Sequence, residues 1–304
     1  MAEYLSIGQV ATVAVGVTTV WTCPEAPRPC DAAAVAADVP RWVAEMTVED
    51  RLGLHDRTLT QLLLGDPVLI DEVVDGWAKI VAPDQACPHL DPRGYTGWLP
   101  SAHLAPTDGA DQSHAEVYVV NSITSKLREA PGGKPADTEV VLGTRLTAAG
   151  SAKAGYLPVI IPGRSELLWA RLSDLVTAPT RPPTASEVLE IAQRLVGVPY
   201  VWGGVSPYGI DCSGLVYLAH RRVGLAVPRD AGDQADASRQ LDSDEAQPGD
   251  LYFFARSGSP IHHVGFVTGR QRTFHASGTA GRVQHDIVAG DLAETLVATH
   301  RTVG

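Results

Sequence analysis

The chain has 304 residues, of which 44% are hydrophobic and 19% are charged, so it can bury more than one core. Its 24 lysine and arginine residues stand against 35 aspartate and glutamate residues, which gives a net charge of −11. This acidic balance argues against nucleic acid and anionic membranes as partners. We expect a globular monomer without membrane insertion, because no apolar stretch is long enough to span a bilayer.

The N-terminal third predicts strands interrupted by helices. Residues 8–22 alternate in the manner of a strand, and no basic region precedes them, so they do not resemble an export signal. This favours the cytoplasm, although a chain trimmed at its N-terminus would look the same, and a secreted or periplasmic location stays open.

Residues 31–47 are rich in alanine with helical spacing, which predicts a helical insertion over about 31–53, broken at Pro40. Short strands with Gly and Asp turns follow, as in a small β-barrel.

A weak internal repeat indicates a second barrel. The segment TQLLLGDPV (60–68) aligns without gaps to TEVVLGTRL (138–146). Two more positions match further along at one common offset, Trp98 with Trp169 and Leu104 with Leu175. The polar residues 108–113 would join the two copies.

The proline-rich segment TAPTRPPT (177–184) predicts a linker, because prolines end helices and central strands. Thr184 and Glu187 have capping-box spacing, and a helical apolar stripe follows them up to Gly197. The predicted fold class is therefore α+β. We expect three domains, namely a first barrel over 1–107, a second over 108–178 and a third domain over 179–304.

Cys212 stands out in the third domain because it opens a predicted helix. Asp211 is the expected N-cap of that helix and Gly224 suits its C-terminal end. Unpaired N–H groups and the helix dipole favour a thiolate at such a position. The other cysteines, at 23, 30 and 87, form no C-x-x-C pair, so we expect free thiols and no structural zinc site. One disulfide among these three stays open.

Two histidines are selected by the register of a predicted hairpin. HHVGFVT and RTFHAS flank the short turn 269–271, and pairing Val267 with Gln271 would place His263 directly opposite His275. In that case His263 can take the thiol proton of Cys212, while His275 orients it. A structural cysteine, or a zinc site with three ligands and a water, is the alternative from residue chemistry alone.

Six segments then carry a family resemblance, occurring in order as YVWGG, DCSGLV, VPRDAGDQ, QPGDLYFF, HVGFV and FHASG. Over about 184–304 the chain resembles the catalytic domain of NlpC-type cysteine peptidases, which are papain-like enzymes acting on bacterial cell-wall peptides. The resemblance implies Cys212 as nucleophile, His263 as base and His275 as the third polar residue. It also implies Tyr200 as a donor to the oxyanion.

The N-terminal part resembles bacterial SH3-like domains. Two such domains before an NlpC-type domain resemble the γ-D-glutamyl-L-diamino-acid endopeptidases, and DPRGYTGWLP (91–100) is similar to a loop of their first SH3-like domain. By this resemblance Tyr95 and Asp211 help to bind the free amine of an N-terminal L-Ala, with Ser213 beside them, and an SH3-like domain restricts the site to short peptides.

Three further residues are weaker substrate-binding candidates. Arg229 and Asp230 occupy the family's Pro-Arg-Asp segment, and they either shape the groove or pair with each other. Ala231 stands where the family often has Ser. Asp66, in the first copy of the repeat, is an acidic candidate for the amine.

The expected function is a cysteine endopeptidase. Its substrates would be peptidoglycan-derived peptides with a free N-terminal L-Ala, cut between D-γ-Glu and the diamino acid, without cofactor or metal. A related amidase or acyltransferase with the same triad, and a non-catalytic peptidoglycan-binding protein, are the alternatives.

Overall fold

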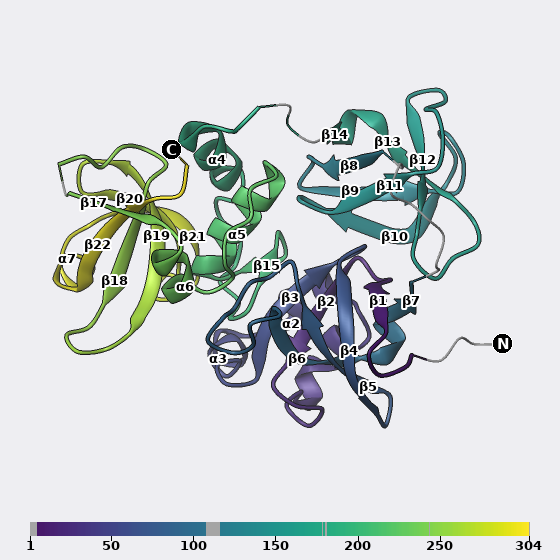
Figure 1. The fold of residues 1–304 in the computed structure, drawn as a ribbon, viewed down its shortest axis with the longest axis horizontal. Helices are drawn as coiled ribbons and strands as arrows, with labels where there is room; N and C mark the ends of the chain where they lie inside the picture. Colours follow the sequence, from purple (N-terminus) through teal and green to yellow (C-terminus); the bar gives the residue numbers. More distant parts are fainter. Residues whose placement is uncertain (1–4, 108–115, 178, 180, 243, 304) are drawn as a thin grey trace.

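The computed structural model describes residues 5–107, 116–177, 179, 181–242 and 244–303. They form three sheet-containing units, which we call the first sheet unit (5–107), the second sheet unit (116–177) and the C-terminal unit (181–303) (Figure 1). The mixture of separate helices and antiparallel sheets agrees with the predicted α+β class. The residues 108–113 that were expected to join the two copies of the repeat lie outside the described residues.

The first sheet unit contains a seven-stranded antiparallel sheet in the order β3-β2-β6-β5-β4-β1-β7. Its strands are β1 (Val10–Val13), β2 (Val17–Trp21), β3 (Thr58–Leu63), β4 (Pro67–Val74), β5 (Trp77–Ala82), β6 (Tyr95–Pro100) and β7 (Leu104–Pro106). Four short helices lie between β2 and β3, namely η1 (Pro29–Asp31), α1 (Ala32–Val35), α2 (Val39–Glu45) and α3 (Val48–Leu52). The predicted helical insertion is therefore present. Pro40 lies in the first turn of α2, where the missing N–H costs nothing, so the break falls just before it.

The second sheet unit repeats this topology, in the order β10-β9-β13-β12-β11-β8-β14. Its strands are β8 (Val117–Val120), β9 (Thr124–Arg128), β10 (Pro135–Val141), β11 (Arg145–Ala148), β12 (Tyr156–Ile160), β13 (Leu168–Arg171) and β14 (Leu175–Thr177). A single-turn 3₁₀ helix precedes the last strand of each unit, η2 (Ser101–His103) in the first and η3 (Leu172–Asp174) in the second.

The aligned segments form equivalent turns in the two units. Asp66 accepts a hydrogen bond from the Leu63 N–H at 3.0 Å, and Thr144 accepts one from the Val141 N–H at 3.2 Å. The glycine that precedes each of them has a positive φ, as such turns require. The sequence repeat is therefore a structural repeat.

The C-terminal unit has a six-stranded antiparallel sheet in the order β17-β22-β18-β19-β20-β21. Its strands are β17 (Arg239–Leu241), β18 (Leu251–Ala255), β19 (Ile261–Gly269), β20 (Arg272–Ser277), β21 (Arg282–Ile287) and β22 (Leu296–Arg301). Its helices are α4 (Ala185–Gln193), α5 (Cys212–Arg222), α6 (Ala231–Asp236) and α7 (Asp291–Thr295), and a small ribbon of β15 (Val205–Ser206) and β16 (Gly209–Ile210) precedes α5.

The helix ends confirm the predicted caps. Thr184 and Glu187 form the capping box of α4, and the Asp211 side chain accepts from the Gly214 N–H at the start of α5. Gly224, just beyond α5, has a φ of 78°. None of the helices in the described part of the chain has the length and apolar character that crossing a membrane requires.

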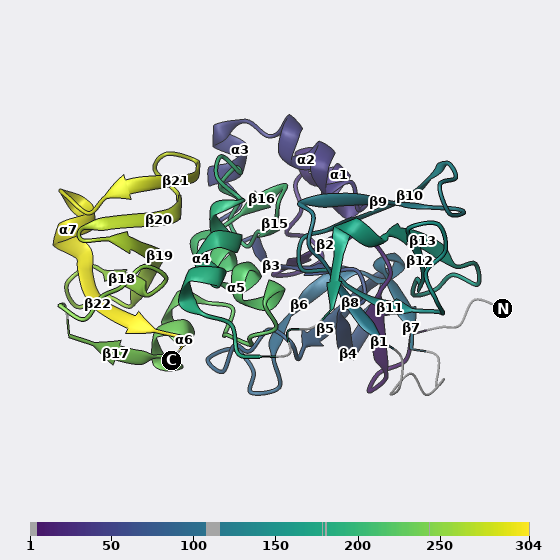
Figure 2. The same ribbon diagram turned by 90° about the horizontal axis from the view of Figure 1, so that it is seen from above.

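Helix α5 joins the three units. Figures 1 and 2 both place α4 and α5 between the C-terminal sheet and the two sheet units, and one hydrophobic core includes buried residues of all three. Arg221, near the end of α5, forms a buried ion pair with Asp66 of the first sheet unit. Its Nε also donates to the Gly143 carbonyl of the second sheet unit at 2.9 Å. A cation buried in this way must be paired, because its desolvation is otherwise uncompensated.

We predict that Asp66→Ala lowers the free energy of unfolding by about 3–5 kcal/mol, because it leaves the Arg221 guanidinium buried without its counter-ion. The matched control is Arg145→Ala, which breaks the exposed pair with Asp84 and should cost less than about 1 kcal/mol. Urea unfolding followed by tryptophan fluorescence measures both values. Equal losses for the two variants would contradict the role given to this pair.

Candidate active site

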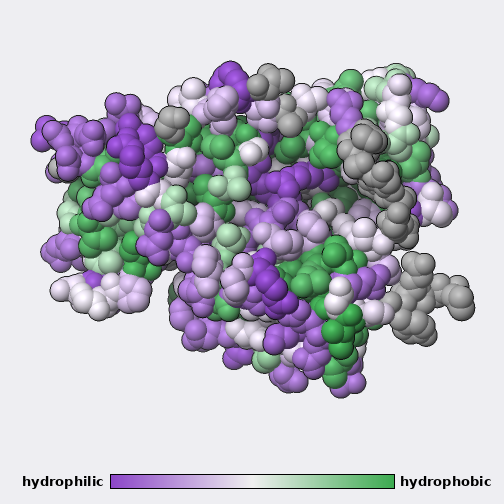
Figure 3. All heavy atoms as spheres, in the orientation of Figure 1, coloured by the Kyte–Doolittle hydropathy of each residue, from purple (hydrophilic) through white to green (hydrophobic). Residues whose placement is uncertain are grey.

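A cleft of about 1740 Å³ lies between the first sheet unit and the C-terminal unit. In Figure 3 the outline of the molecule has a notch between the first sheet unit, at the bottom of the view, and the C-terminal sheet, at the left. Among the described residues, no side chain of the second sheet unit lines the cleft. The second sheet unit packs against α5 instead.

Cys212 is the first residue of α5, lines the cleft and is 7% exposed. Burial and the neighbouring Asp211 carboxylate raise the pKa of its thiol to about 12, although the backbone N–H groups of Ser213 and Val264 act in the opposite direction. The helix start favours the thiolate, but desolvation has the larger effect. Cys212 is therefore a neutral thiol in the resting protein, and not the thiolate that the sequence led us to expect.

His263 and His275 meet within the cleft. His263 Nε2 lies 2.6 Å from His275 Nδ1, and the two rings are in an edge contact at 4.9 Å between centroids. The predicted register was wrong by two residues, because Val267 pairs with Thr273 and a bulge follows before the turn. His275 therefore lies opposite Gly265, and His263 is its diagonal neighbour on the same face, since side chains alternate with a period of two.

Gly265 makes this contact feasible. A Cβ at this position would lie 2.9 Å from the Cβ of His275 and 2.4 Å from the Thr273 hydroxyl oxygen. The strand β19 therefore leaves an opening opposite His275, and the imidazole of His263 reaches across it.

Asp286 on β21 extends the pair into a chain of three groups. Its Oδ2 accepts from His275 Nε2 at 3.0 Å and from Gln284 Nε2 at 2.7 Å. Burial would raise the pKa of the Asp286 carboxyl, but these two hydrogen bonds outweigh it and hold that pKa below its usual value.

This chain fixes the tautomer of both imidazoles. The Asp286 carboxylate can only accept, so His275 carries its proton on Nε2 and presents a lone pair at Nδ1. His263 then donates from Nε2, and its own lone pair lies at Nδ1. Burial, and the neighbouring His275 and His262, lower the pKa of His263 to about 3, so it is a neutral base at ordinary pH.

Sequence reasoning missed Asp286, although the same kind of argument could have found it. In the next hairpin His275 pairs with Gln284, so Asp286, two residues further on, is again a diagonal neighbour on the same face. Extending the register analysis from one hairpin to two would have identified it.

Tyr200, the residue that the resemblance implies as a donor to the oxyanion, also lines the cleft. Burial first, and then the neighbouring Cys212 and Asp211, raise the pKa of its hydroxyl well above the usual value. The group is therefore a neutral O–H donor throughout the ordinary pH range.

Arg229 is fully buried beside the start of α5, where its guanidinium meets Asp211. Its guanidinium donates to both carboxylate oxygens of Asp211, at 2.7 and 3.1 Å, and to the Ser213 hydroxyl at 2.8 Å. Nε donates to Thr60 Oγ1 of the first sheet unit at 2.9 Å. Arg229 does not line the cleft, and its main ion partner is Asp211 and not Asp230, which is 3.9 Å away. The expectation of direct contact between Arg229 and substrate is therefore corrected.

Asp211 and Ser213 do line the cleft, but both are already occupied. Besides the Arg229 guanidinium, the Asp211 carboxylate accepts from the backbone N–H groups of Gly203 at 2.9 Å and Gly214 at 2.6 Å. Its side chain is 10% exposed. A further cation would meet few free lone pairs there.

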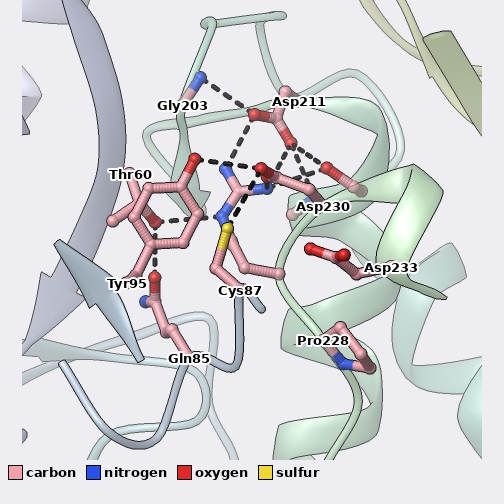
Figure 4. Close-up of polar contacts among 12 residues, drawn as sticks. Thr60, Gln85, Cys87, Tyr95, Gly203, Asp211, Pro228, Asp230 and Asp233 are labelled. Atoms are coloured by element: carbon pink, nitrogen blue, oxygen red, sulfur yellow. Dashed lines mark hydrogen bonds and ion pairs between the residues drawn. The ribbon is translucent and has the colours of Figure 1, made fainter. Parts of the chain in front are cut away.

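Tyr95 and Asp230 meet at the other side of this network. The Tyr95 hydroxyl donates to Asp230 Oδ2 at 3.1 Å, across the junction of the first sheet unit and the C-terminal unit (Figure 4). Both residues line the cleft, and the Asp230 side chain is 30% exposed. Asp230 is therefore the better-placed carboxylate for a ligand amine. Asp66 is not brought to the cleft, because it is buried against Arg221.

The cysteines and histidines do not support the alternative zinc site at Cys212. Within the described residues, Cys212, His263 and His275 are not among the groups whose ligand atoms converge on a common point. His263, His275 and Asp286 are instead arranged in series. All four cysteines are described, and each is a free thiol, as expected.

Comparison with known proteins agrees with this geometry. Residues 197–302 match the model of the NlpC/P60 family. The chain is 32% identical over 279 residues to the gamma-D-glutamyl-L-lysine dipeptidyl-peptidase of Bacillus subtilis, covering 90% of this chain and 92% of that protein. It is 30% identical to the enzyme of the same name from Bacillus cereus, covering 88% and 82% of the two chains. A crystal structure of an NlpC/P60 family protein from Bacillus cereus superposes with a TM-score of 0.89 at 28% identity, over 97% of this chain and 100% of that one.

We predict that Asp286→Asn lowers the kcat of peptide hydrolysis by about 10- to 100-fold, the range typical of groups that orient an imidazole through its second nitrogen. An amide can donate to His275 Nε2, which disfavours the working tautomer, whereas KM should change little because Asp286 acts through His275. Asp291→Asn, which removes another carboxylate of the cleft wall, is the control. A normal kcat for Asp286→Asn would show that the hydrogen-bond chain has no role in proton transfer.

We also predict that kcat/KM keeps its value as the pH falls below 6.5, the ordinary pKa of histidine. A base whose pKa is depressed to about 3 stays neutral, and so can accept the thiol proton, until the medium is far more acidic. The measurement is the pH profile of kcat/KM with a substrate that does not titrate between pH 4.5 and about 7. An acid limb centred near 6.5 would contradict the buried, neutral state of His263.

Proposed function

The chain belongs to the NlpC/P60 family of cysteine peptidases, and we propose that it cleaves the bond between D-γ-Glu and the diamino acid in cell-wall peptides with a free N-terminal L-Ala. The two Bacillus relatives are named gamma-D-glutamyl-L-lysine dipeptidyl-peptidases, and a dipeptidyl-peptidase releases a dipeptide from a free amino end. The observation that carries the proposal is the meeting of Tyr95 and Asp230 in the cleft that Cys212 lines.

The proposed amine subsite follows from which carboxylate is free. Asp211 is surrounded by donors, whereas Asp230 accepts from Tyr95 and from a weak S–H contact of Cys87 at 3.6 Å. A partly exposed carboxylate at the wall of a cleft forms a charge-assisted hydrogen bond with an ammonium. Asp230 therefore replaces Asp211 as the residue that binds the free amine, and Asp211 holds the start of α5 in place.

In the proposed mechanism, the Cys212 thiol gives its proton to His263 Nδ1 as the sulfur attacks the γ-carbonyl carbon of D-Glu. The Cys212 backbone N–H and the Tyr200 hydroxyl donate to the oxyanion of the tetrahedral intermediate. The intermediate collapses as His263 protonates the leaving amine of the diamino acid, which leaves a thioester. Water then attacks the thioester, with His263 accepting its proton, and releases the dipeptide and the free thiol.

The first sheet unit supplies the specificity in this proposal. We propose that both sheet units are SH3-like barrels, and that the first closes one end of the cleft with Tyr95 and with the loop that precedes β6. A wall at that end leaves no path for a longer chain on the amino side. The substrates are therefore short, peptidoglycan-derived peptides and not the intact wall.

The test is hydrolysis of L-Ala-γ-D-Glu-meso-diaminopimelate and its L-Lys counterpart, each with a free and an acetylated amine. We predict that Asp230→Asn raises KM for the free peptide by about 10- to 100-fold, since a hydrogen bond to a charged group contributes roughly 1.5–3 kcal/mol. Acetylation should have at least as large an effect on the parent and little further effect on Asp230→Asn.

Two variants serve as controls. Asp236→Asn removes an exposed carboxylate from the same helix and the same cleft wall, and should leave KM unchanged. Cys212→Ala should abolish turnover. Equal cleavage of the acetylated and free peptides would refute amine recognition, and turnover by Cys212→Ala would refute the mechanism as a whole.

A further inference from the structure

Four potential metal ligands converge at the junction of two units, beside the proposed amine subsite. Cys87 and His89 come from the loop between β5 and β6, and Asp230 and Asp233 come from the start of α6. One ligand atom from each of the four lies within 4.8 Å of all the others. Figure 4 shows the Cys87 sulfur close to Asp230, with Asp233 on the neighbouring turn.

Two of the distances among these atoms match those of a tetrahedral zinc site, and a third is shorter. With Zn–S near 2.3 Å and Zn–N or Zn–O near 2.0–2.2 Å, tetrahedral ligand atoms lie about 3.3–3.6 Å apart. The Cys87 sulfur lies 3.5 Å from His89 Nδ1 and 3.6 Å from Asp230 Oδ2. His89 Nδ1 lies 2.9 Å from Asp233 Oδ2. Completing the geometry requires the His89 ring and the Asp233 carboxylate to move slightly apart.

The charge balance of the cluster also points to a cation. Two carboxylates and a thiol lie together, and the nearest described guanidinium is that of Arg229, 3.9 Å from Asp230, whose shorter contacts go to Asp211. The His89 ring contacts both carboxylates, at 3.8 Å from Asp230 and 2.9 Å from Asp233. His89 is half exposed at 53%, and its ring already contacts Asp233 and the Cys87 sulfur, so binding of a metal ion would exchange these contacts for coordination. Cys87, by contrast, is 1% exposed and held in place by the fold.

We propose that Cys87, His89, Asp230 and Asp233 bind one Zn²⁺ ion, and that this ion excludes the peptide amine from Asp230. Coordination releases the Cys87 thiol proton to solvent, and His89 binds as the neutral imidazole. A thiolate, an imidazole and two carboxylates favour Zn²⁺ over Mg²⁺ or Ca²⁺, which take oxygen ligands. The second half of the proposal rests on the proposed function, because it assumes that Asp230 meets the amine.

Metal binding is tested first without turnover, by calorimetric titration of Zn²⁺ alone into the Cys212→Ala variant, which removes the thiol that lines the cleft. We expect one saturable site per chain. Adding His89→Ala should weaken it on the order of tenfold or more, because one of four ligands is lost. His55→Ala, which removes another exposed histidine of the same cleft, is the matched control and should leave binding unchanged. The site is refuted if no saturable binding occurs, or if His55→Ala weakens it as much as His89→Ala.

Exclusion of the amine is tested by kinetics of the Cys212-containing enzyme with the free peptide. Zn²⁺ should raise KM and leave kcat unchanged in the parent, and His89→Ala should lose this effect relative to its own metal-free rate. Zinc acting at Cys212 and His263 would instead inhibit the parent and His89→Ala equally, which would overturn amine exclusion. Because the calorimetry needs no turnover, failure of the peptidase proposal leaves the binding result intact.

Discussion

The buried Arg229 guanidinium is the constraint on which the geometry of the site depends. A fully buried cation requires partners on all sides, and its donors are met by Asp211, Ser213 and Thr60. Asp211 is also the N-cap of the helix that Cys212 begins. Arg229 therefore fixes the start of α5, where the proposed nucleophile lies, and its hydrogen bond to Thr60 ties this helix to β3 of the first sheet unit. A cleft built between two units needs such a link, because relative motion would separate Tyr95 from Asp230.

Burial sets the protonation states of the proposed nucleophile, Cys212, and its proposed base, His263, together. Desolvation raises the pKa of Cys212 and lowers that of His263, so both are neutral before substrate binds. Proton transfer must then accompany attack, and the base needs its lone pair in the correct place beforehand. The chain from Asp286 through His275 to His263 meets this need, because a carboxylate at one end allows only one arrangement of protons along it.

Local signals in the sequence predicted much of this site, and contacts between distant segments account for what they missed. The N-cap at Asp211 follows from the residue preference at a helix start, the repeat from the similarity of two segments, and the facing of His263 and His275 from the alternation of side chains along a hairpin. The hairpin register was two residues off, yet the histidines stayed on one face because an even shift preserves the alternation. In contrast, the partners Tyr95 and Asp230 are 135 residues apart, and Cys87 and Asp230 are 143 apart. No spacing in the chain encodes such pairs. The sequence therefore favours Asp211 over Asp230 as the residue that binds the amine, and it does not indicate that Cys87 and His89 lie beside Asp230 and Asp233.

The two copies of the internal repeat both contact the side chain of Arg221. Gly65-Asp66 and Gly143-Thr144 are equivalent turns of the two sheet units, and both meet this one side chain of α5. The first copy gives the Asp66 carboxylate, and the second gives the Gly143 carbonyl. The two turns also contact each other, since a Cβ at Gly65 would lie 3.0 Å from the Arg145 carbonyl oxygen. Both copies of the repeat therefore contact α5, while among the described residues the first copy alone also lines the cleft.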